Sequence, residues 1–319
     1  MTTVYHGIAE VPAGFGPSIA AIGNFDGVHR GHQRILGAVV AEARHRGMRA
    51  LAVTFDPHPE EFLRPASAPG LLTPMEHRLC LLAAAGLDAI LVLRFDESLA
   101  RLSAREFVQR VLVHALEVRG LHEGGNFRCG YKAEAGVQEL AAFGVEFGFG
   151  ITVHAPVHVH GLEVSSSAIR ALVAAGDVKR ARWMLGRPFS VQSTQKRDRG
   201  VGAKLLVPTI NFAEYDGLLP AHGIYVTRLG IGVRCFPAVS SLGIRPTFAD
   251  AGFALETHIL DFEPVEIDAT TLLELEFLYR LRDEEKYPTI ELLKAQIRRD
   301  VANANRFFRI HSSLRKDRP

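Results

Sequence analysis

The sequence predicts an α/β fold in two parts, a parallel sheet covered by helices followed by a small antiparallel β-barrel with a C-terminal helix. Three observations support this prediction. The chain has 319 residues, a length that fits two domains of roughly 150 residues each. Strand and helix patterns alternate up to about residue 186. Beyond that residue, strand patterns follow one another without helices between them.

The first half alternates apolar runs with helical patterns. Runs typical of buried strands lie at residues 18–23, 49–55 and 89–93. Residues 32–46 repeat apolar side chains along one helical face, and a second long helix is expected over residues 168–185. Capping boxes at residues 73–76 (TPME) and 103–106 (SARE) predict two further helix starts. Strands separated by helices form parallel sheets, so we expect a parallel sheet covered on both faces.

The second half has the pattern of an antiparallel barrel. Strands are predicted at residues 223–228, 255–260 and 273–281, the last of which alternates apolar and charged side chains with a period of two. A final amphipathic helix is predicted over residues 289–307. Because Gly186 and Pro188 end the preceding helical pattern, we expect two domains, residues 1–186 and 187–319.

Charge and cysteine content restrict the class of partner and the compartment. Lys and Arg number 37 against 35 for Asp and Glu, a net charge of +2. This near-balance argues against nucleic acid or an anionic membrane as the main partner, while a local pocket for phosphate remains compatible with it. The cysteines Cys80, Cys129 and Cys235 lie far apart without a C-x-x-C pair. Together with the lack of a signal-peptide pattern at the start, they predict a reducing, cytoplasmic environment.

The densest motif is GNFDGVHRGH at residues 23–32, between the first predicted strand and its helix. Parallel sheets bind ligands at the carboxyl ends of their strands, and a helix N-terminus offers free N–H groups to phosphate. His29 and His32 can point to one side of such a turn and donate hydrogen bonds to phosphoryl oxygens. The alternative is a tight turn with two surface histidines. A zinc pair is disfavoured because no third-ligand motif accompanies it.

A second motif is SSSAIR at residues 165–170, at the start of a helical pattern. Serines at a helix start cap free N–H groups and also bind phosphate, and Arg170 adds a fixed positive charge. Alone, this motif is a helix cap. Together with the histidine motif it forms the second half of a nucleoside triphosphate site.

These two motifs resemble those of the H-x-G-H nucleotidyltransferases, and the whole chain is similar to the bacterial bifunctional riboflavin kinase/FAD synthetases. The resemblance implies a Rossmann-like nucleotidyltransferase domain over residues 1–186 and a riboflavin-kinase-like barrel over residues 187–319. It also rests on the stretches at residues 53–59 (VTFDPHP), 125–130 (GNFRCG), 185–189 (LGRPF), 207–211 (VPTIN), 219–225 (LPAHGIY), 243–248 (GIRPTF) and 255–258 (LETH).

For the second domain, the resemblance implies phosphoryl transfer from ATP to riboflavin, giving FMN. Glu256 matches the family's general base, which an alcohol nucleophile needs within hydrogen-bond reach. Thr209 and Asn211 match residues that hold Mg²⁺ and the nucleotide phosphates, and Gly200 and Gly202 belong to the phosphate-binding loop. Taken alone, Thr209 and Asn211 are more typical of turn residues, and Glu256 of a solvated strand carboxylate.

For the first domain, the resemblance implies transfer of AMP from ATP to FMN, giving FAD and pyrophosphate. His29 and His32 would face the transferring phosphoryl group, which needs positioning and charge stabilisation more than a base. The expected ATP and phosphate contacts are Gly23, Asn24, Asp26, Gly31, Ser165, Ser166 and Arg170. The expected flavin contacts are Pro57, His58, Pro59 and Asn126.

The sequence departs from the family pattern in three places. Many relatives have Asp at the position of Asn126 and Phe at that of Cys129. The usual loop G-x-G-R-x-L-G-F-P-T-x-N reads GVGAKLLVPTIN at residues 200–211, with Leu206 in place of the glycine before Pro-Thr. Two alternatives therefore stay open, an FMN adenylyltransferase with a weak or structural kinase-like domain, and a flavin-binding protein without turnover. Riboflavin, FMN and ATP are the expected partners, and the sequence makes no prediction of oligomeric state.

Overall fold

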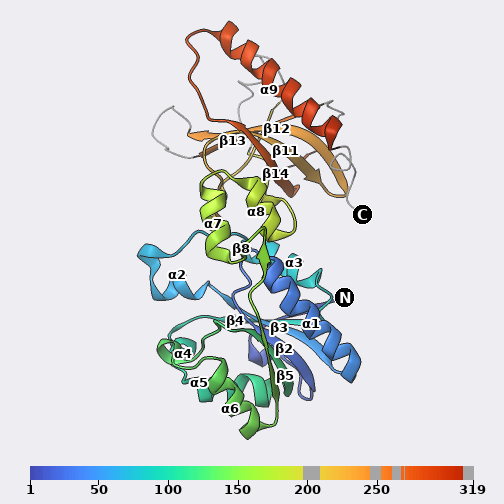
Figure 1. Cartoon of the computed structure of the whole chain (residues 1–319), viewed down its shortest axis with the longest axis vertical. Coiled ribbons are helices and arrows are strands. Elements are labelled where there is room, and N and C mark those ends of the chain that lie inside the picture. Colours follow the sequence, from blue (N-terminus) through green and yellow to red (C-terminus); the bar gives the residue numbers. More distant parts are fainter. Residues whose placement is uncertain (197–208, 245–252, 261–266, 269, 312–319) are drawn as a thin grey trace. The chain divides into compact units, whose positions relative to one another are not determined.

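The computed structural model describes residues 1–196, 209–244, 253–260, 267–268 and 270–311 (Figure 1). The chain forms two compact units, Met1–Ser166 and Ser167–Pro319. The division falls about twenty residues before the predicted boundary at residue 186. Helix α8 (Val178–Leu185) explains this difference, because it packs on strands of the second unit.

The first unit is built on a six-stranded sheet in the order β1-β4-β3-β2-β5-β6. All of its neighbouring strands pair in parallel, which confirms the prediction. The strands are β1 (Thr3–His6), β2 (Ser18–Ile22), β3 (Arg49–Asp56), β4 (Ala89–Arg94), β5 (Val118–Gly124) and β6 (Gly150–His154). Strands β7 (His158–Val159) and β8 (Leu162–Glu163) form a separate short hairpin.

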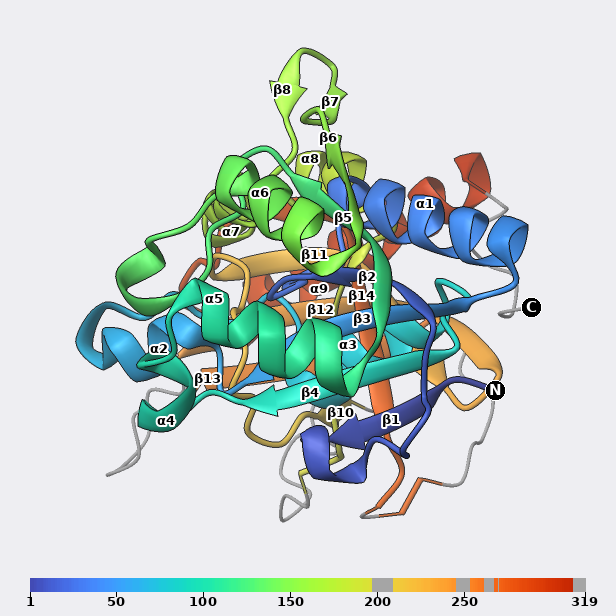
Figure 2. The ribbon, with the colours of Figure 1, turned by 90° about the horizontal axis from the view of Figure 1, so that it is seen from below.

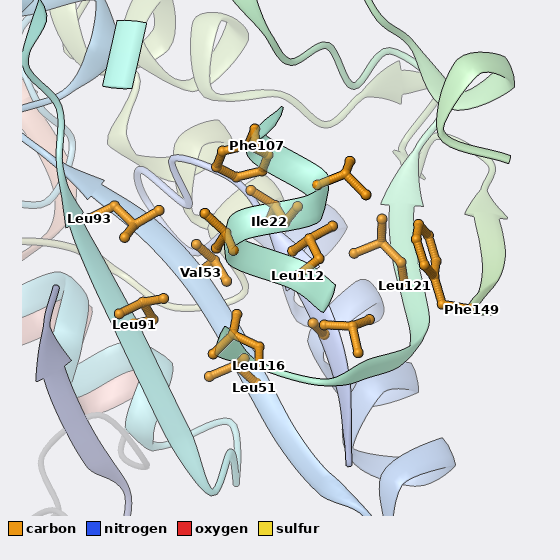
Figure 3. Close-up of a cluster of buried hydrophobic side chains, with 14 of the residues drawn as sticks. Ile22, Leu51, Val53, Leu91, Leu93, Phe107, Leu112, Leu116, Leu121 and Phe149 are labelled. Carbon is orange, nitrogen blue, oxygen red and sulfur yellow. The ribbon is translucent and has the colours of Figure 1, made fainter. Parts of the chain in front are cut away.

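Helices cover both faces of this sheet (Figure 2). Successive side chains of each buried strand point to opposite faces of the sheet. Both faces are covered, as the continuous apolar runs of these strands predict. Ala20, Leu51 and Leu91 pack with helices α5, η3 and α6 in the cluster of Figure 3, whereas Ile19 and Ala50 pack with α1 and α3. The helices are α1 (Arg30–Arg46), α2 (Pro59–Leu63), α3 (Met75–Ala83), α4 (Glu97–Ala100), α5 (Ala104–Phe107), the π-helical η3 (Val108–Ala115) and α6 (Val137–Phe147), with 3₁₀ turns at Ile8–Glu10, Pro65–Ser67 and Tyr131–Ala133.

The second unit contains a six-stranded antiparallel sheet in the order β10-β13-β12-β11-β14-β9. Its strands are β9 (Phe189–Ser193), β10 (Thr209–Asn211), β11 (Gly223–Ile231), β12 (Arg234–Ile244), β13 (Phe253–Ile259) and β14 (Leu273–Arg282). The two edge strands join just beyond their ends, because the Lys196 N–H donates to the Asn211 carbonyl at 2.8 Å and the Ala213 N–H to the Thr194 carbonyl at 2.9 Å. The sheet therefore closes into the predicted barrel, and helix α9 (Ile290–Ile310) packs on it through Ala304 and Phe308.

Two predicted helices differ from the structure. Helix α3 begins at Met75 with no side-chain cap, so the predicted capping box at Thr73 is wrong, whereas the one at Ser103 is confirmed. The predicted helix over residues 168–185 is two helices, α7 (Ser166–Ala174) and α8. Gly176 adopts a left-handed φ of 77° and the Asp177 side chain caps α8, which is the usual way that one helix ends and another begins.

The period of two in β14 holds only as far as Phe277. The pairing of β14 with β11 shifts register between Phe277 and Tyr279, so that Leu278 is buried against α9 and Tyr279 is exposed. A bulge of this kind reverses which side chains face the core beyond it. Within the described ranges, no helix has both the length and the apolar character needed to cross a membrane.

Candidate active sites

The histidine turn, residues 23–32, connects the carboxyl end of β2 to the first residues of α1. His29 is the N-cap of α1, and its Nδ1 accepts the backbone N–H of His32 at 3.2 Å. The two imidazole rings stack at 3.6 Å between centroids with an interplanar angle of 15°, which confirms that both histidines lie on one side of the turn. Because Nδ1 accepts a hydrogen bond, the neutral His29 ring carries its proton on Nε2.

His32 is held in the neutral form by its surroundings. Burial lowers the pKa of His32 well below its ordinary value of 6.5, and the nearby His29 and Arg78 lower it further. Its Nδ1 is buried and has no hydrogen-bond partner among the residues that the structure describes. Gly31 leaves room for the pair, because a Cβ there would lie 3.0 Å from His29 Cε1. The turn thus presents two imidazoles, of which His32 is held neutral, at a helix N-terminus, where phosphate groups bind.

Asp26, which we expected to contact ATP, uses its carboxylate within the protein. Oδ1 accepts the Thr73 N–H at 2.9 Å and the Thr73 hydroxyl at 3.2 Å, and Oδ2 accepts the Leu72 N–H at 3.0 Å. Arg78 lies 3.9 Å from Oδ1, and both side chains are 1% exposed. The Thr73 hydroxyl in turn accepts the Gly27 N–H at 2.9 Å. Asp26, Thr73 and Arg78, which we call the turn lock, fasten the histidine turn to the start of α3.

The turn lock holds a backbone that is otherwise unfavourable. Phe25 and Val28 have positive φ angles of 47° and 36° although neither is glycine, and each is only 2% exposed. Such conformations persist when surrounding contacts over-determine them. The Asn24 carbonyl adds to these contacts, because it accepts from Arg78 Nη1 at 3.1 Å and from the Thr54 hydroxyl at 3.3 Å. The histidine pair is therefore positioned before any ligand binds.

The serine motif contacts the same turn through Ser166. Helix α7 begins at Ser166, whose hydroxyl donates to the Asp26 carbonyl at 2.8 Å. Its hydroxyl proton is therefore engaged by the protein. Ser165 precedes the helix and is half-buried, and Arg170 lies one turn further along α7. Gly23, at the other end of the turn, donates its N–H to the Val53 carbonyl of β3 at 3.0 Å.

The predicted flavin residues lie beyond the carboxyl ends of β3 and β5, the strands on either side of β2. Pro57 is exposed and Pro59 opens α2. His58 is buried and caps this helix, because its Nδ1 accepts the Glu60 N–H at 3.2 Å. Asn126 is exposed on the loop after β5. All of these residues lie at the same edge of the sheet as the histidine turn, where ligands of open α/β sheets bind.

The second unit brings Thr209, Asn211 and Glu256 to one face of its sheet. In the β10–β13 pair, Asn211 is opposite Glu256 and Thr209 is opposite His258. Residues opposite each other share a face, so the hydroxyl, amide and carboxylate are neighbours. Asn211 Oδ1 is buried and has no hydrogen-bond partner in the described part of the chain. Glu256 is exposed. Gly200 and Gly202 lie outside the described residues.

Three residues near the histidine turn were not predicted from the sequence. Thr73 carries the pattern of a helix cap, and Arg78 lies on an ordinary helical face, so neither indicates a contact with Asp26. Glu123 lies near the end of β5 and is 2% exposed, and its carboxyl group accepts the Ile22 N–H at 2.8 Å. A lone carboxylate at the end of a buried strand is the one signal that could have indicated it.

The first unit thus has a parallel α/β sheet with a pair of histidines in the turn at its carboxyl edge. The second unit is a closed barrel with an oxygen-rich face. Family profiles match both parts, "FAD synthetase" at residues 13–168 and "Riboflavin kinase" at residues 185–308. A bifunctional riboflavin kinase/FMN adenylyltransferase of Pseudomonas fluorescens is 37% identical, covering 90% of this chain and 91% of its own. That of Escherichia coli K12 is 34% identical over 91% and 92%.

The chain belongs to the bifunctional riboflavin kinase/FMN adenylyltransferase family. A crystal structure titled as a macrolide-efflux protein from Streptococcus pneumoniae shares its fold, with a TM-score of 0.85 and 24% sequence identity over 95% of this chain and 98% of that one.

Proposed function

We propose that this chain makes FAD from riboflavin in two steps, each at its own site. The observation that carries the proposal is that one chain holds both reactive sets, the stacked pair His29 and His32 in one unit and the opposed pair Asn211 and Glu256 in the other. In the first step, the γ-phosphoryl group of ATP passes to the ribityl hydroxyl of riboflavin and gives FMN. In the second, the FMN phosphate attacks the α-phosphorus of another ATP, and pyrophosphate leaves.

In the kinase step, Glu256 serves as the base. Its exposed carboxylate accepts the hydroxyl proton as the oxygen attacks phosphorus, a contribution of about 10²–10⁴-fold for a positioned general base. Thr209 and Asn211 face the phosphates from the neighbouring strand. An oxygen-rich pair of this kind fits Mg²⁺. Asn211 Oδ1, which is buried and has no hydrogen-bond partner among the described residues, supports that fit. When bound there, Mg²⁺ supplies positive charge that offsets the charge of the phosphates.

In the adenylyl-transfer step, no strong base is needed, because the FMN phosphate is already ionised. The proton on His29 Nε2 is donated to a phosphoryl oxygen as negative charge grows there, an effect whose removal costs about 10²–10³ in rate in comparable sites. His32, kept neutral by burial, orients the same group. Ser165, the backbone N–H groups at the start of α7 and Arg170 take the pyrophosphate, and Pro57, Pro59 and Asn126 border the flavin.

Two assignments change in the light of the contacts. Asp26 acts through the turn lock rather than as a ligand of ATP, because its carboxylate oxygens already accept from Leu72 and Thr73. Ser166 acts through its contact with the turn. We assign adenylyl transfer to residues 1–186 and riboflavin phosphorylation to residues 187–319. A cytoplasmic location is part of the proposal, supported by three free cysteines.

The test is incubation of the purified chain with riboflavin, ATP and Mg²⁺, followed by chromatographic separation of FMN and FAD. Both products are expected in sequence. The His29→Ala variant should stop at FMN, and the Glu256→Ala variant should make FAD only from supplied FMN. A wild-type chain that makes FAD from FMN but no FMN from riboflavin would leave only the adenylyltransferase alternative. A chain that binds flavin and makes neither product would leave only the binding-protein alternative.

A further inference from the structure

Strands β2 and β5 separate at the carboxyl edge of the first unit's sheet. Their pairing runs from Ser18 opposite Val118 to Ala20 opposite Leu121. Beyond that point β2 stays paired with β3 as far as Ile22, and β5 stays paired with β6 as far as Gly124. In the sheet, β3 lies on one side of β2 and β5 on the other, so the strand order reverses between β2 and β5. This gap is therefore the switch point of the sheet, where ligands of α/β folds bind.

Glu123 bridges this gap with its side chain. It lies beyond the last β5 residue that pairs with β2, and its Oε1 accepts the N–H of Ile22, the last residue of β2, at 2.8 Å. Ile22 is 3% exposed, and β5 offers no backbone carbonyl at this level of the ladder. Without the carboxyl group the buried N–H would be unpaired, which proteins avoid. The carboxyl group thus replaces one rung of the sheet immediately before the histidine turn.

Burial of the Glu123 carboxyl group favours its neutral form. Burial raises the pKa of Glu123 well above the ordinary range, and the Ile22 N–H, which favours the ionised form, offsets part of this rise. The titratable group that faces it is the Cys129 thiol on the loop after β5, whose pKa is raised to about 12 by burial and then by the charges of Glu123, Glu134 and Glu139. No cationic side chain in the described ranges forms an ion pair with Glu123. A protonated acid provides the rung without placing a negative charge beside a site for anionic phosphates.

We propose that Glu123 is a positioning residue for adenylyl transfer, whose side chain replaces the missing β2–β5 rung and holds the histidine turn at the open switch point. This inference rests on the proposed function of the first unit. It goes beyond that function because Glu123 acts through its hydrogen bond to Ile22, a residue outside the predicted sites.

The test compares Glu123→Gln with Glu123→Val. Glutamine keeps the acceptor and the shape of the protonated acid but cannot ionise, whereas valine keeps an apolar strand residue and removes the acceptor. At neutral pH, the Gln variant should retain kcat/KM for FAD formation within about twofold, and the Val variant should lose at least tenfold. On raising the pH from neutral to alkaline, the KM for ATP should rise in the wild-type chain and stay flat in the Gln variant. Riboflavin phosphorylation by the same preparations is the control, since it takes place in the other unit and should not change.

Hydrogen exchange gives a readout that does not depend on activity. Peptides covering residues 18–32 should exchange slowly in the wild-type chain and the Gln variant and faster in the Val variant, while peptides from β11 are unchanged. The inference is overturned if the Val variant keeps both its activity and its protection, or if the Gln variant is impaired as much as the Val variant. If the wild-type chain makes no FAD, the proposed function fails, and the exchange comparison still decides whether Glu123 holds the end of β2.

Discussion

Replacing Asp26 tests whether the histidine turn depends on the turn lock or whether Asp26 contacts ATP directly. In the Asp26→Ala variant, the N–H groups of Leu72 and Thr73 lose their acceptor, and the buried Arg78 guanidinium loses its counter-charge. Removing one partner of a buried charged pair costs about 3–5 kcal/mol. Arg78 keeps its hydrogen bonds to the Asn24 and Thr73 carbonyls, so we expect a loss near the lower end, about 3 kcal/mol of unfolding free energy.

Such a loss is large against a total stability of about 5–15 kcal/mol for a typical domain. It can be measured by urea unfolding followed by far-UV circular dichroism. The single tryptophan, Trp183, lies in the second unit, so its fluorescence reports the unfolding of that unit separately. In the Asp26→Ala variant, the urea midpoint seen by tryptophan fluorescence should equal that of the wild-type chain. The lower midpoint should appear in the part of the dichroism signal that comes from the first unit.

The other members of the turn lock separate the two explanations of an activity loss. If Asp26 acts through the turn, Thr73→Val and Arg78→Met should lower FAD formation as Asp26→Ala does, and the double variant Asp26→Ala/Arg78→Met should lose less stability than the sum of its parts. FMN formation should be unchanged in all of them. The reasoning is refuted if Asp26→Ala costs less than about 1 kcal/mol yet abolishes FAD formation, while Thr73→Val leaves that activity intact.

Three further predictions concern single residues. Because the pKa of His32 is lowered in the folded chain, the unfolded chain takes up more protons as the pH falls below about 6.5, so the free energy of unfolding at pH 7 should decrease toward about pH 5. Urea unfolding at both pH values should show a smaller decrease in the His32→Gln variant than in the wild-type chain. An equal decrease in the two would contradict His32 as its origin. Glu256→Gln should lower riboflavin phosphorylation by at least about 100-fold and leave FAD formation from supplied FMN unchanged, whereas full kinase activity would reject its role as base. Gly31→Ala, whose Cβ would crowd His29 Cε1 at 3.0 Å, should lower FAD formation about tenfold or more. The control Gly37→Ala lies in the same helix with open space around it, so it should keep this activity and gain up to about 1 kcal/mol of unfolding free energy. Equal activities of the two variants would refute the effect of crowding at Gly31.

The parallel strands were predictable because burial on both faces makes each of them a continuous apolar run, as in residues 49–55. Local patterns failed where a contact from another element decided the outcome. The alternation in β14 predicts an inward Tyr279, but the bulge after Phe277 turns Leu278 toward α9 instead. At residues 175–177 the local signals of a helix end and a new N-cap are present, and the apolar periodicity on either side concealed them.

The same distinction applies to the candidate site. The residues of the histidine turn are adjacent in sequence, so a motif shows them together, whereas Asp26 meets Thr73 across 47 positions and Ile22 meets Glu123 across 101. A contact between a side chain and a distant backbone N–H leaves no periodicity and no spacing in either segment. For this reason the sequence predicted the residues of the histidine turn but not the distant residues that contact it.

Hydrogen-bond accounting then separates the members of the motif by role. Both Asp26 carboxylate oxygens accept from the protein, so the group has the contacts of a structural anchor. His29 uses Nδ1 as an acceptor for its own helix, and this choice fixes on Nε2 the proton that it can offer to a phosphoryl oxygen. Under the proposed function, the N-cap contact therefore also prepares His29 to donate to the phosphoryl group, since a ring protonated on Nδ1 would lose the cap and present an acceptor to an anion. Local folding energy and the donor required by the reaction favour the same tautomer.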